Sequence, residues 1–592
     1  MFLLFIVLNS NLFFQIESAK ILAYFPIPSI SHQVVFRPLT QELAKQGHEV
    51  VVVTPDPAFP KGQAPARLKE IDVHEISYNY WAKFLATATG NKDDLATQLE
   101  VAFDSISMIF EKQLAVEEVQ EIIKNKNNTF DLLLLEACAM PVLSLSFIYN
   151  SPVILVSSFG GLIGNYELLG APNHPIFYPL PLRQRLYNLT TWETLNELYY
   201  NHFKMFQLFD DQEEKQNKAL RKIFGVNFPG LAKLKSNVHM LFLNIHPIWD
   251  NNRPVPPNII YMGGLHQKPR KELPSNLTSI LDSSKDGVIY FSFGTNVDPA
   301  LLPPEKIEIF LKVFSKLPYT ILWKWQSKMS FTVSNNVKVM KWFPQSDLLR
   351  HPKIKLFITQ GGLQSTDEAI TGGVPLIGIP MLGDQWFNVE KYVHHGLGVR
   401  LDLDTLTEDK LLNAIKTVIN DESSRKNVIK LRTLMEDQIQ KPLDRAVWWI
   451  EHVLRHGGAQ HLRTTSANLS WSQYYRIDLI LITITALLVF VGLCIVISYC
   501  IIKNFLIMDR RVLGYFVHIA RRNPDNLNKL VVVGKIEGKR SQGRSLTRWS
   551  SSAGYIGTQY HDCPETAEDR TAWRQLVDTA VKAYQDKHDL QK

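Results

Sequence analysis

The chain has 592 residues, of which 45% are hydrophobic and 20% charged, so it is a globular protein large enough for several domains. Its net charge of +7 comes from the end of the chain, because residues 503–592 contain 16 Lys and Arg against 10 Asp and Glu, and residues 1–502 contain 48 against 47. A nucleic-acid-binding surface on the main part is therefore not expected. The four cysteines exclude a disulfide-stapled scaffold, because only Cys138 precedes the apolar run near the end.

The N-terminus predicts a secretory signal peptide over residues 1–19. Residues 1–16 are mostly apolar, and Glu17, Ser18 and Ala19 follow as a cleavage region. No basic side chain precedes the apolar run, so a buried N-terminal strand is the alternative interpretation.

A βαβ unit comes next. Residues 21–25 form an apolar strand, residues 26–32 a turn, residues 34–46 an amphipathic helix and residues 49–54 a second apolar strand. His32 lies where the first strand gives way to the helix, and open α/β sheets bind ligands at the carboxyl ends of their strands. A single loop histidine is more often solvated than functional, so its position alone leaves both interpretations open.

Three more strands are predicted in the first half, over residues 130–135, 152–158 and 238–244. The first of them ends at a carboxylate, Glu136. Residues 57–129 give fewer signals, and their aromatic side chains can line a substrate pocket or simply fill the core.

The second half also alternates strands with polar loops. The strand that begins at Gly287 ends in the loop Ser292-Phe-Gly294-Thr295, and strands over residues 319–325 and 337–341 follow. The carboxyl ends of parallel strands meet at one edge of a sheet, so these loops can converge on one ligand.

The stretch from Trp342 to Gln385 is the most informative. It holds a strand that ends at Gln360, a Gly-Gly turn and a polar helix start, where the backbone can approach a ligand and the helix N-terminus favours an anion. In order, the stretch contains Trp342, Phe343, Gln345, Gln360, Gly361, Gly362, Gln364, Ser365, Thr366, Glu368, Asp384 and Gln385. The Gly-Gly turn alone would also suit an ordinary strand–helix connection.

These residues, at these spacings and without a gap, resemble the donor signature of the family-1, UDP-sugar-dependent glycosyltransferases. The resemblance covers residues 20–503 and implies the GT-B fold, in which two Rossmann-like α/β domains face each other across a cleft. It implies that Trp342 faces the uracil, and that Gln345 and Glu368 reach the ribose. Asp384 and Gln385 would then hold the sugar hydroxyls.

The same resemblance assigns the diphosphate to two loops. Residues 360–366 would surround it, and Ser292, Gly294 and Thr295 resemble the second phosphate-side loop of the family. Gln360 stands where many members have His, so this side chain can donate a hydrogen bond to phosphate but carries no charge.

The motifs around His32 resemble the N-terminal acceptor domain of the family, which makes His32 the candidate general base. Imidazole suits this task because its ordinary pKa lies near physiological pH. Glu136 occupies the position of a carboxylate, usually Asp, that orients the base. It is one methylene longer, so a structural carboxylate at the strand end is the alternative. His48, in the same motif, is interpreted as structural.

The function that follows is inverting transfer of a hexose from a UDP-sugar to the hydroxyl of a small lipophilic acceptor, as in detoxification or in pigment or hormone conjugation. Residues 253–264 resemble the arthropod branch, for which glucose is the expected sugar. The UDP-sugar is a co-substrate, and neither a cofactor nor a metal is expected: the helix start would stabilise the diphosphate, and Asp402-Leu-Asp404 is predicted in a polar loop, not at a strand end.

Other classes remain as alternatives. A membrane-anchored ectodomain that binds a nucleotide sugar or an odorant without turnover is the main one. A phosphorylase or an epimerase is disfavoured, because no pyridoxal-type lysine motif or G-x-G-x-x-G fingerprint is present. No nucleic-acid partner is expected for the enzyme part, and a homo-oligomer is left open.

An apolar run over residues 479–502 has no charge in 24 residues, long enough to cross a bilayer. Lys503, Arg510 and Arg511 follow it, so the positive-inside rule places the tail in the cytosol. The expectation is a single-pass type I protein of the endoplasmic reticulum membrane with a lumenal catalytic part. N-glycosylation sequons begin at Asn127, Asn188, Asn276 and Asn468, all before the run.

These signals divide the chain into seven parts. They are the signal peptide 1–19, an acceptor-binding domain 20–264, a linker 265–283, a UDP-sugar-binding domain 284–456, a juxtamembrane segment 457–478, a transmembrane helix 479–502 and a cytosolic tail 503–592.

The tail departs from the family pattern. Its G-K-x-x-G-K-R-x-x-G-R-x-x-x-R-W and A-E-D-R-x-x-W runs resemble the C-terminal end of reverse transcriptases from non-LTR retrotransposons. We interpret residues 503–592 as a fused gene model or an exonised element, unrelated to the enzyme. A cytosolic tail that binds anionic lipid or RNA through its basic run is the alternative.

Overall fold

The computed structural model describes residues 18–88, 95–125, 127–162, 164–172, 174–297, 299–329 and 331–520, with residues 571 and 575. The predicted signal peptide lies almost wholly outside the described residues, as do Cys563 and most of the tail. The chain divides into two compact units, Met1–Ser470 and Trp471–Lys592.

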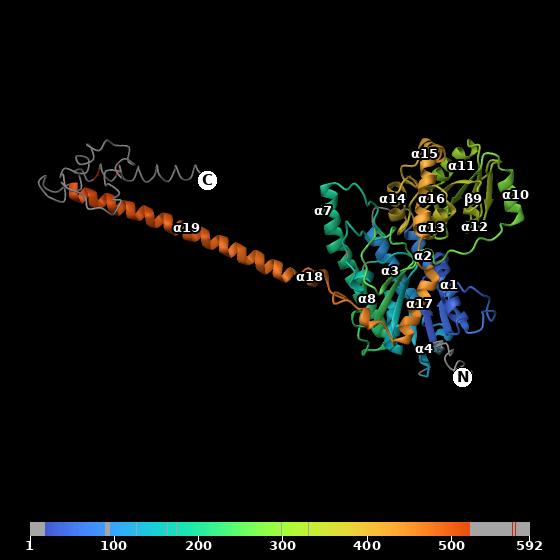
Figure 1. Ribbon diagram of the computed structural model, residues 1–592, viewed down its shortest axis with the longest axis horizontal. Helices are drawn as coiled ribbons and strands as arrows, with labels where there is room; N and C mark the ends of the chain where they lie inside the picture. The colour runs from blue at the N-terminus through green and yellow to red at the C-terminus, as the bar shows by residue number, and fades with distance from the viewer. Residues whose placement is uncertain are drawn as a thin grey trace, which may run out of the picture. The chain divides into compact units, whose positions relative to one another are not determined.

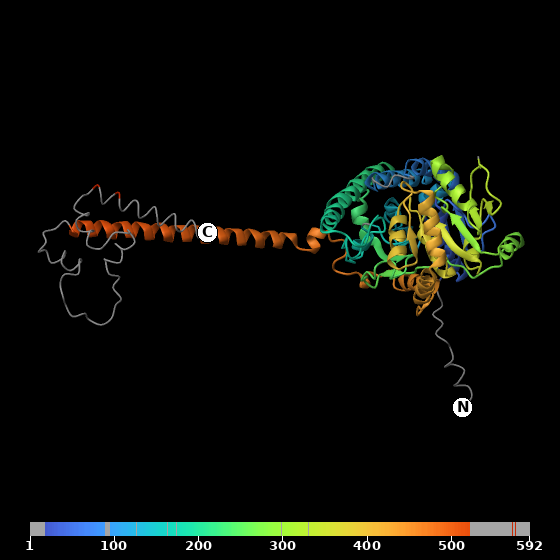
Figure 2. The same cartoon turned by 90° about the horizontal axis from the view of Figure 1, so that it is seen from above.

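The first unit contains two parallel sheets with helices packed on the outside (Figures 1 and 2). The first sheet has the order β3-β2-β1-β4-β5-β6-β7. Its strands are β1 (Lys20–Tyr24), β2 (Glu49–Thr54), β3 (Leu68–Asp72), β4 (Leu132–Glu136), β5 (Val153–Ser157), β6 (Val238–Leu243) and β7 (Ile259–Tyr261). Strands β1, β4 and β5 are buried on both faces, which explains their unbroken apolar sequences.

The second sheet repeats this arrangement, with the order β10-β9-β8-β11-β12-β13. Its strands are β8 (Val288–Ser292), β9 (Thr320–Lys324), β10 (Val337–Met340), β11 (Ile354–Thr359), β12 (Leu376–Gly378) and β13 (Gly398–Arg400). In each sheet the strand order reverses between the first strand and the fourth, β1 and β4 or β8 and β11. A Rossmann-like sheet binds its ligand at that switch point.

The helices of the first half are α1 (Ile30–Lys45), α2 (His74–Ala88), α3 (Leu95–Gln113), α4 (Glu117–Lys124), α5 (Leu145–Tyr149), α6 (Asn165–Leu168), α7 (Thr191–Tyr199), α8 (Phe206–Phe224) and α9 (Leu231–Leu234). The helices that follow are α10 (Ser275–Ser283), α11 (Pro304–Ser315), α12 (Gln345–Leu349), α13 (Leu363–Gly372), α14 (Gln385–His394), α15 (Glu408–Asn420), α16 (Glu422–Glu436), α17 (Pro442–Arg455), α18 (Trp471–Tyr474) and α19 (Ile477–Ala520).

Several local predictions differ from the structure. Helix α1 begins at Ile30, so His32 lies in its first turn and not in the preceding loop. The linker 265–283, which was expected to be exposed, contains α10, and this helix buries Leu277 and Leu281. Asp402 follows β13 by two residues, so the predicted polar loop does begin at a strand end. Strand β13 has only three residues, too few for an apolar pattern to show.

Helix α17 returns to the first sheet after the second sheet is complete. Ala446, Val447 and Ile450 belong to the same buried cluster as Ile21 of β1, and Figure 1 shows α17 beside α1. The predicted domain 284–456 therefore ends in a helix that packs on the first domain. This packing of α17 against the first sheet joins the two domains in one compact unit.

A buried histidine, His48, adds a polar contact between α17 and the first domain. The imidazole of His48 lies 2.6 Å from a carboxylate oxygen of Glu451 on α17 through Nε2, and Nδ1 accepts the Ala19 N–H at 3.2 Å. His48 is wholly buried, and Glu451 is nearly so. This arrangement agrees with a structural role for His48.

The second unit begins with α18 and α19. An 18-residue window within Ile477–Val512 of α19 has a mean hydropathy of 3.1, and this segment is long and apolar enough to cross a membrane. The helix is longer than the predicted run 479–502, since it continues through the first basic residues.

Candidate active site

A cavity of about 690 Å³ lies between the two sheets. Its walls come from both halves of the first unit, with Ile27, His32 and Phe103 on one side and Trp342, Gln345 and Asp384 on the other. The walls of the first half are mainly apolar, and those of the second half are mainly polar. The cavity therefore offers space for a lipophilic molecule next to space for a polar one.

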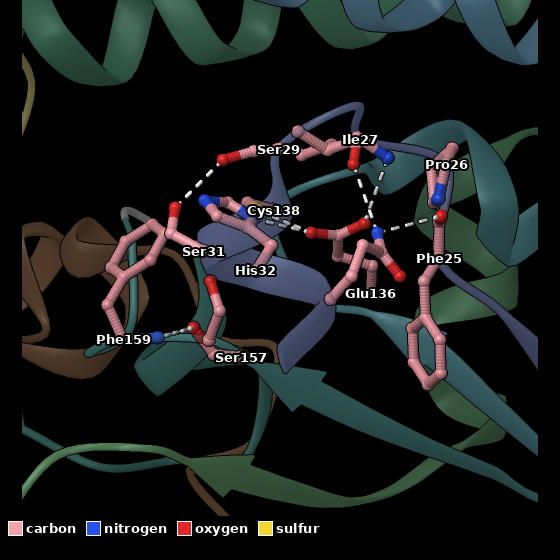
Figure 3. A network of polar contacts seen from close by, with 12 residues as sticks. Phe25, Pro26, Ile27, Ser29, Ser31, His32, Glu136, Cys138, Ser157 and Phe159 are labelled. Atoms are coloured by element: carbon pink, nitrogen blue, oxygen red, sulfur yellow. Dashed lines mark hydrogen bonds and ion pairs between the residues drawn. The ribbon is translucent and has the colours of Figure 1, made fainter. Parts of the chain in front are cut away.

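His32 and Glu136 face each other at the switch point of the first sheet (Figure 3). His32 is in the first turn of α1 and Glu136 ends β4, and the imidazole Nδ1 lies 2.7 Å from a carboxylate oxygen. When Nδ1 carries the proton and donates this hydrogen bond to the carboxylate, the other ring nitrogen, Nε2, is free to accept a proton. His32 lines the cavity with its side chain 17% exposed, whereas Glu136 is wholly buried behind it.

Two further contacts hold the Glu136 carboxylate. Its second oxygen accepts the Ile27 N–H at 3.1 Å, and the Cys138 thiol lies 3.7 Å from the first. Burial and the neighbouring carboxylate raise the pKa of Cys138, so the thiol stays protonated and donates a hydrogen bond to Glu136. The three donors satisfy a carboxylate that is out of contact with water.

The side chains of His32, Glu136 and Cys138 also form a group with metal-ligand chemistry, since their ligand atoms lie within 4.8 Å of one another. The short contact between Nδ1 and the carboxylate is the arrangement of an oriented base. Asp402, in contrast, pairs with Arg400 at 2.9 Å, and neither Asp402 nor Asp404 is among the described residues that line the cavity.

The Gly361–Gly362 turn lies at the switch point of the second sheet, between β11 and α13. Gly361 has a φ of 93°, and a Cβ there would lie 2.5 Å from the side chain of Val389, so only glycine fits. Gly294, in the loop after β8, has a φ of 75°, and a Cβ there would collide with the Gln360 amide. The N-terminus of α13 thus opens toward the cavity, as an anion site requires.

The amide of Gln345 lies in a polar cluster with Glu368. Its Nε2 donates to the Glu368 carboxylate at 2.7 Å and to Ser365 Oγ at 2.9 Å, and its Oε1 accepts the Tyr290 hydroxyl at 3.1 Å. Burial raises the pKa of Glu368 to about 7. The pair brings together an amide and a carboxylate that suit vicinal hydroxyls.

Trp342 presents the exposed face of an indole at the edge of the same cluster. Its side chain is 60% exposed, and the Lys324 ammonium lies 4.5 Å from the ring centroid. Lys324 ends β9 and donates to the Gly294 carbonyl at 2.8 Å. Burial lowers the pKa of Lys324 to about 8, so it is still mostly charged at neutral pH.

Asp384 and Gln385 open α14 at the centre of the cleft. Gln385 Oε1 accepts the N–H groups of Met381 and Leu382, each at 2.8 Å, which fixes the turn before the helix. Asn388 donates to the Asp384 carboxylate at 2.8 Å. Burial raises the pKa of Asp384 to about 6.

The structure brings most of the predicted site residues to one cavity. Those that line it are His32, Gly294, Thr295, Trp342, Phe343, Gln345, Gln360, Gly362, Gln364, Ser365, Glu368, Asp384 and Gln385. Those that stand behind its wall are Glu136, Ser292, Gly361 and Thr366. Gln364 also donates to the Ser158 carbonyl of the first half at 2.9 Å, so one donor-signature residue joins the two halves.

Some lining residues had no signal in the sequence analysis. Lys324 could have been found by its place at the end of a strand. Asn296 is bonded across the cleft to Ser29, with its amide 3.1 Å from the hydroxyl, and only the fold brings these residues together. Gln98, on α3, and His266, in the connection between the sheets, were likewise not predicted.

Solved structures show the class of this fold. The chain resembles the glycotransferase of kitacinnamycin, with a TM-score of 0.51, 18% sequence identity and coverage of 74% of this chain and 98% of that one. It resembles UDP-glucose: anthocyanidin 3-O-glucosyltransferase in complex with UDP equally well, with a TM-score of 0.51, 15% identity and coverage of 74% and 99%. The two facing Rossmann-like domains have the GT-B fold.

The family follows from the sequence comparisons. Residues 19–513 match the model of the UDP-glucoronosyl and UDP-glucosyl transferase family, and the chain belongs to that family of UDP-glycosyltransferases. An ecdysteroid UDP-glucosyltransferase of Spodoptera littoralis nuclear polyhedrosis virus is 35% identical over 483 residues, which is 78% of this chain and 93% of the relative. UDP-glucosyltransferase 2 of Dactylopius coccus is 33% identical over 509 residues, which is 84% of this chain and 95% of the relative.

Proposed function

We propose that this enzyme transfers glucose from UDP-glucose to the hydroxyl of a small lipophilic acceptor, with inversion at the anomeric carbon. The observation that carries the proposal is the His32–Glu136 pair: its histidine lines the apolar side of the same cavity that Asp384 and Gln385 line on the polar side. The choice of glucose is supported by the names of the two relatives, both glucosyltransferases.

In this mechanism His32 acts as the general base. Nε2 removes the proton of the acceptor hydroxyl as the oxygen attacks the anomeric carbon, and the bond from that carbon to the diphosphate oxygen breaks on the opposite face. Glu136 keeps the imidazole in the required tautomer and stabilises the imidazolium that forms. A single displacement of this kind inverts the configuration.

The donor side holds the UDP-sugar through distinct groups. The indole of Trp342 faces the uracil, and Gln345 and Glu368 bind the ribose. The turn at residues 360–366 and the loop of Ser292, Gly294 and Thr295 bind the diphosphate, where the α13 N-terminus favours the negative charge that develops on UDP. Asp384 and Gln385 bind the sugar hydroxyls. The step needs no metal or cofactor in this scheme.

We further propose that α19 anchors the enzyme in the endoplasmic reticulum membrane with the catalytic part in the lumen. The basic residues after the apolar run support this orientation. All four sequon asparagines, Asn127, Asn188, Asn276 and Asn468, are exposed, so oligosaccharides can be attached. Residues 503–592 would then form a cytosolic tail outside the enzyme.

The test is UDP release from UDP-glucose by the full-length protein in microsomes, with 1-naphthol and other phenols, and detection of the glucoside by mass spectrometry. The proposal predicts equal amounts of UDP and β-glucoside. Tight binding of UDP-glucose without release, with any acceptor, would instead favour a nucleotide-sugar-binding ectodomain. Release with another UDP-sugar alone would overturn the choice of glucose.

A further inference from the structure

The apolar side of the cavity contains one polar side chain far along the chain from the His32–Glu136 pair. Helix α3 turns one face to the cavity, and Leu99, Ala102, Phe103 and Ile106 of this face are apolar. The fifth lining residue of α3 is Gln98, one turn before Ala102. The spacing of these five positions is that of one helix face, so the amide belongs to the wall that the apolar residues form.

Gln98 is buried, and within the described part of the chain it lacks a hydrogen-bond partner. It is only 7% exposed, and neither its Oε1 nor its Nε2 has a partner among the residues that the structure describes. A primary amide offers two donors and one strong acceptor, and buried amides are normally paired. An unpaired amide that faces a ligand cavity is therefore a group for which the ligand supplies the partner.

Other buried amides of the first half show the contrast. Gln113, at the end of the same helix, donates through Nε2 to the Pro26 carbonyl and the Ser77 hydroxyl, each at 2.8 Å, and only its Oε1 lacks a partner among the described residues. Gln33 on α1 donates to the Ile27 carbonyl at 3.0 Å. Gln212 on α8 is also unpaired within the described part of the chain, but it does not line the cavity. Gln98 both lacks a partner among the described residues and lines the cavity.

We propose that Gln98 recognises the acceptor by binding a carbonyl or hydroxyl group that lies apart from the hydroxyl that receives the sugar. This inference rests on the proposed transferase function and narrows its substrate class. The acceptor is then a molecule with an extended apolar skeleton and at least two polar groups, one held near His32 and one near Gln98. A simple apolar phenol fills the cavity but leaves the amide unpaired.

The experiment compares phenols that differ by one ketone too distant to change the acidity of the phenol. Two pairs are used: 4-cyclohexylphenol with 4-(4-hydroxyphenyl)cyclohexanone, and 3-hydroxyestra-1,3,5(10)-triene with estrone. The full-length protein is assayed with UDP-glucose for kcat/KM, as wild type, as Gln98→Leu and as the control Leu99→Met, which changes the same wall without a hydrogen bond.

The wild type should prefer the ketone of at least one pair by about 5- to 100-fold, the range that an unpaired buried polar group costs. Gln98→Leu should bring the ratio of the two kcat/KM values near unity, mainly by raising kcat/KM for the phenol without the ketone. Leu99→Met should keep the preference for the ketone. Ratios within twofold for both pairs in the wild type, or an unchanged preference in Gln98→Leu, would overturn the proposal. Glucosylation of 1-naphthol without any activity on either pair would also overturn it.

A protein that transfers sugar to no phenol would refute the proposed function and not this inference. In that case the same pairs are titrated by calorimetry against the UDP-bound protein. A preference for the ketone that Gln98→Leu removes would support the recognition role, and equal affinities would overturn it. Thermal unfolding of each variant with UDP shows whether the fold is retained.

Discussion

Trp249 of the first half donates its indole N–H to the side-chain oxygen of Asn388 on α14, at 2.8 Å. The Asn388 amide nitrogen in turn donates to the Gly361 carbonyl at 2.9 Å and to the Asp384 carboxylate at 2.8 Å. Trp249 thereby fixes the orientation of the Asn388 amide. This amide joins Gly361, in the turn assigned to the diphosphate, to Asp384, which is assigned to the sugar. Trp249 and Asn388 are both buried, so no water competes for these bonds.

Trp249→Phe should weaken binding of the sugar part of the donor. The change leaves Asn388 Oδ1 buried without its donor, and the amide that positions Asp384 becomes free to rotate. KM for UDP-glucose should rise by about 5- to 30-fold, with a smaller change in kcat and in the Kd of UDP.

The matched control is Trp323→Phe. Trp323 of β9 is 1% exposed, and its indole nitrogen has no partner among the described residues. This variant should lose thermal stability but keep the wild-type KM for UDP-glucose. Equal KM values in the two variants would show that Trp249 acts only through packing.

Asp384→Ala and Trp342→Ala should separate the sugar from the nucleotide. Asp384→Ala should weaken UDP-glucose by about tenfold or more and leave UDP nearly unchanged, because the carboxylate is assigned to the sugar hydroxyls. Trp342→Ala should weaken both ligands, because the indole is assigned to the base. Calorimetric titration of both ligands distinguishes the cases, and equal losses for Asp384→Ala would refute the division.

Donor binding should depend on the ionisation of Asp384, whose pKa burial raises to about 6. Below this pH the carboxyl is protonated and the sugar hydroxyls lose their anionic acceptor, so KM for UDP-glucose should rise by up to about tenfold per unit as pH falls from 6 to 5. The groups that interact with it are Asn388, His32 and Tyr392. In Asp384→Asn this rise in KM at low pH should be absent. A rise that persists in the variant would come from the ionisation of another group.

The raised pKa of Asp384 also makes the stability of the free enzyme depend on pH. The folded-state pKa of Asp384 lies above the unfolded value of about 3.9, so its contribution to stability is fully present below about pH 4 and is lost as pH rises through 6. Asp384→Asn should therefore raise Tm at pH 7 more than at pH 4. Differential scanning calorimetry at the two pH values measures this difference.

Truncation after Asn504 should leave transferase activity in microsomes unchanged. The apolar run of α19 would still cross the membrane, and residues beyond it would lie on the other side from the catalytic part. Glycosidase-sensitive mobility serves as the control for correct insertion. A truncated protein that is made and glycosylated but inactive would show that the tail is part of the working enzyme.

The main architecture could be predicted from the sequence because the central strands are continuous apolar runs. Residues 130–135 became β4 and residues 238–244 became β6, each within one or two residues. The edge of the first sheet could not be predicted in this way. β3 has the sequence Leu-Lys-Glu-Ile-Asp, which is polar because an edge strand faces solvent, and its position is set by pairing with β2.

Most of the candidate donor residues could be expected to lie together, because a continuous signature from Trp342 to Gln385 carries them. Contacts between distant segments were not. His32 and Glu136 are 104 positions apart, and Trp249 and Asn388 are 139 apart, so only the folded sheets bring them together. Gln98 has no local signal at all, since an amide in an amphipathic helix is ordinary until the cavity and the missing partner are seen.

The most direct measurement is the rate at which His32→Ala glucosylates a phenol under saturating UDP-glucose. Removal of a positioned base should lower kcat by about 10²–10⁴-fold and leave the Kd of UDP unchanged. His74→Ala, which removes a histidine that is 57% exposed and does not line the cavity, should keep the wild-type rate. A His32→Ala enzyme that works at the wild-type rate would contradict the assignment of His32 as the base, and with it the proposed mechanism.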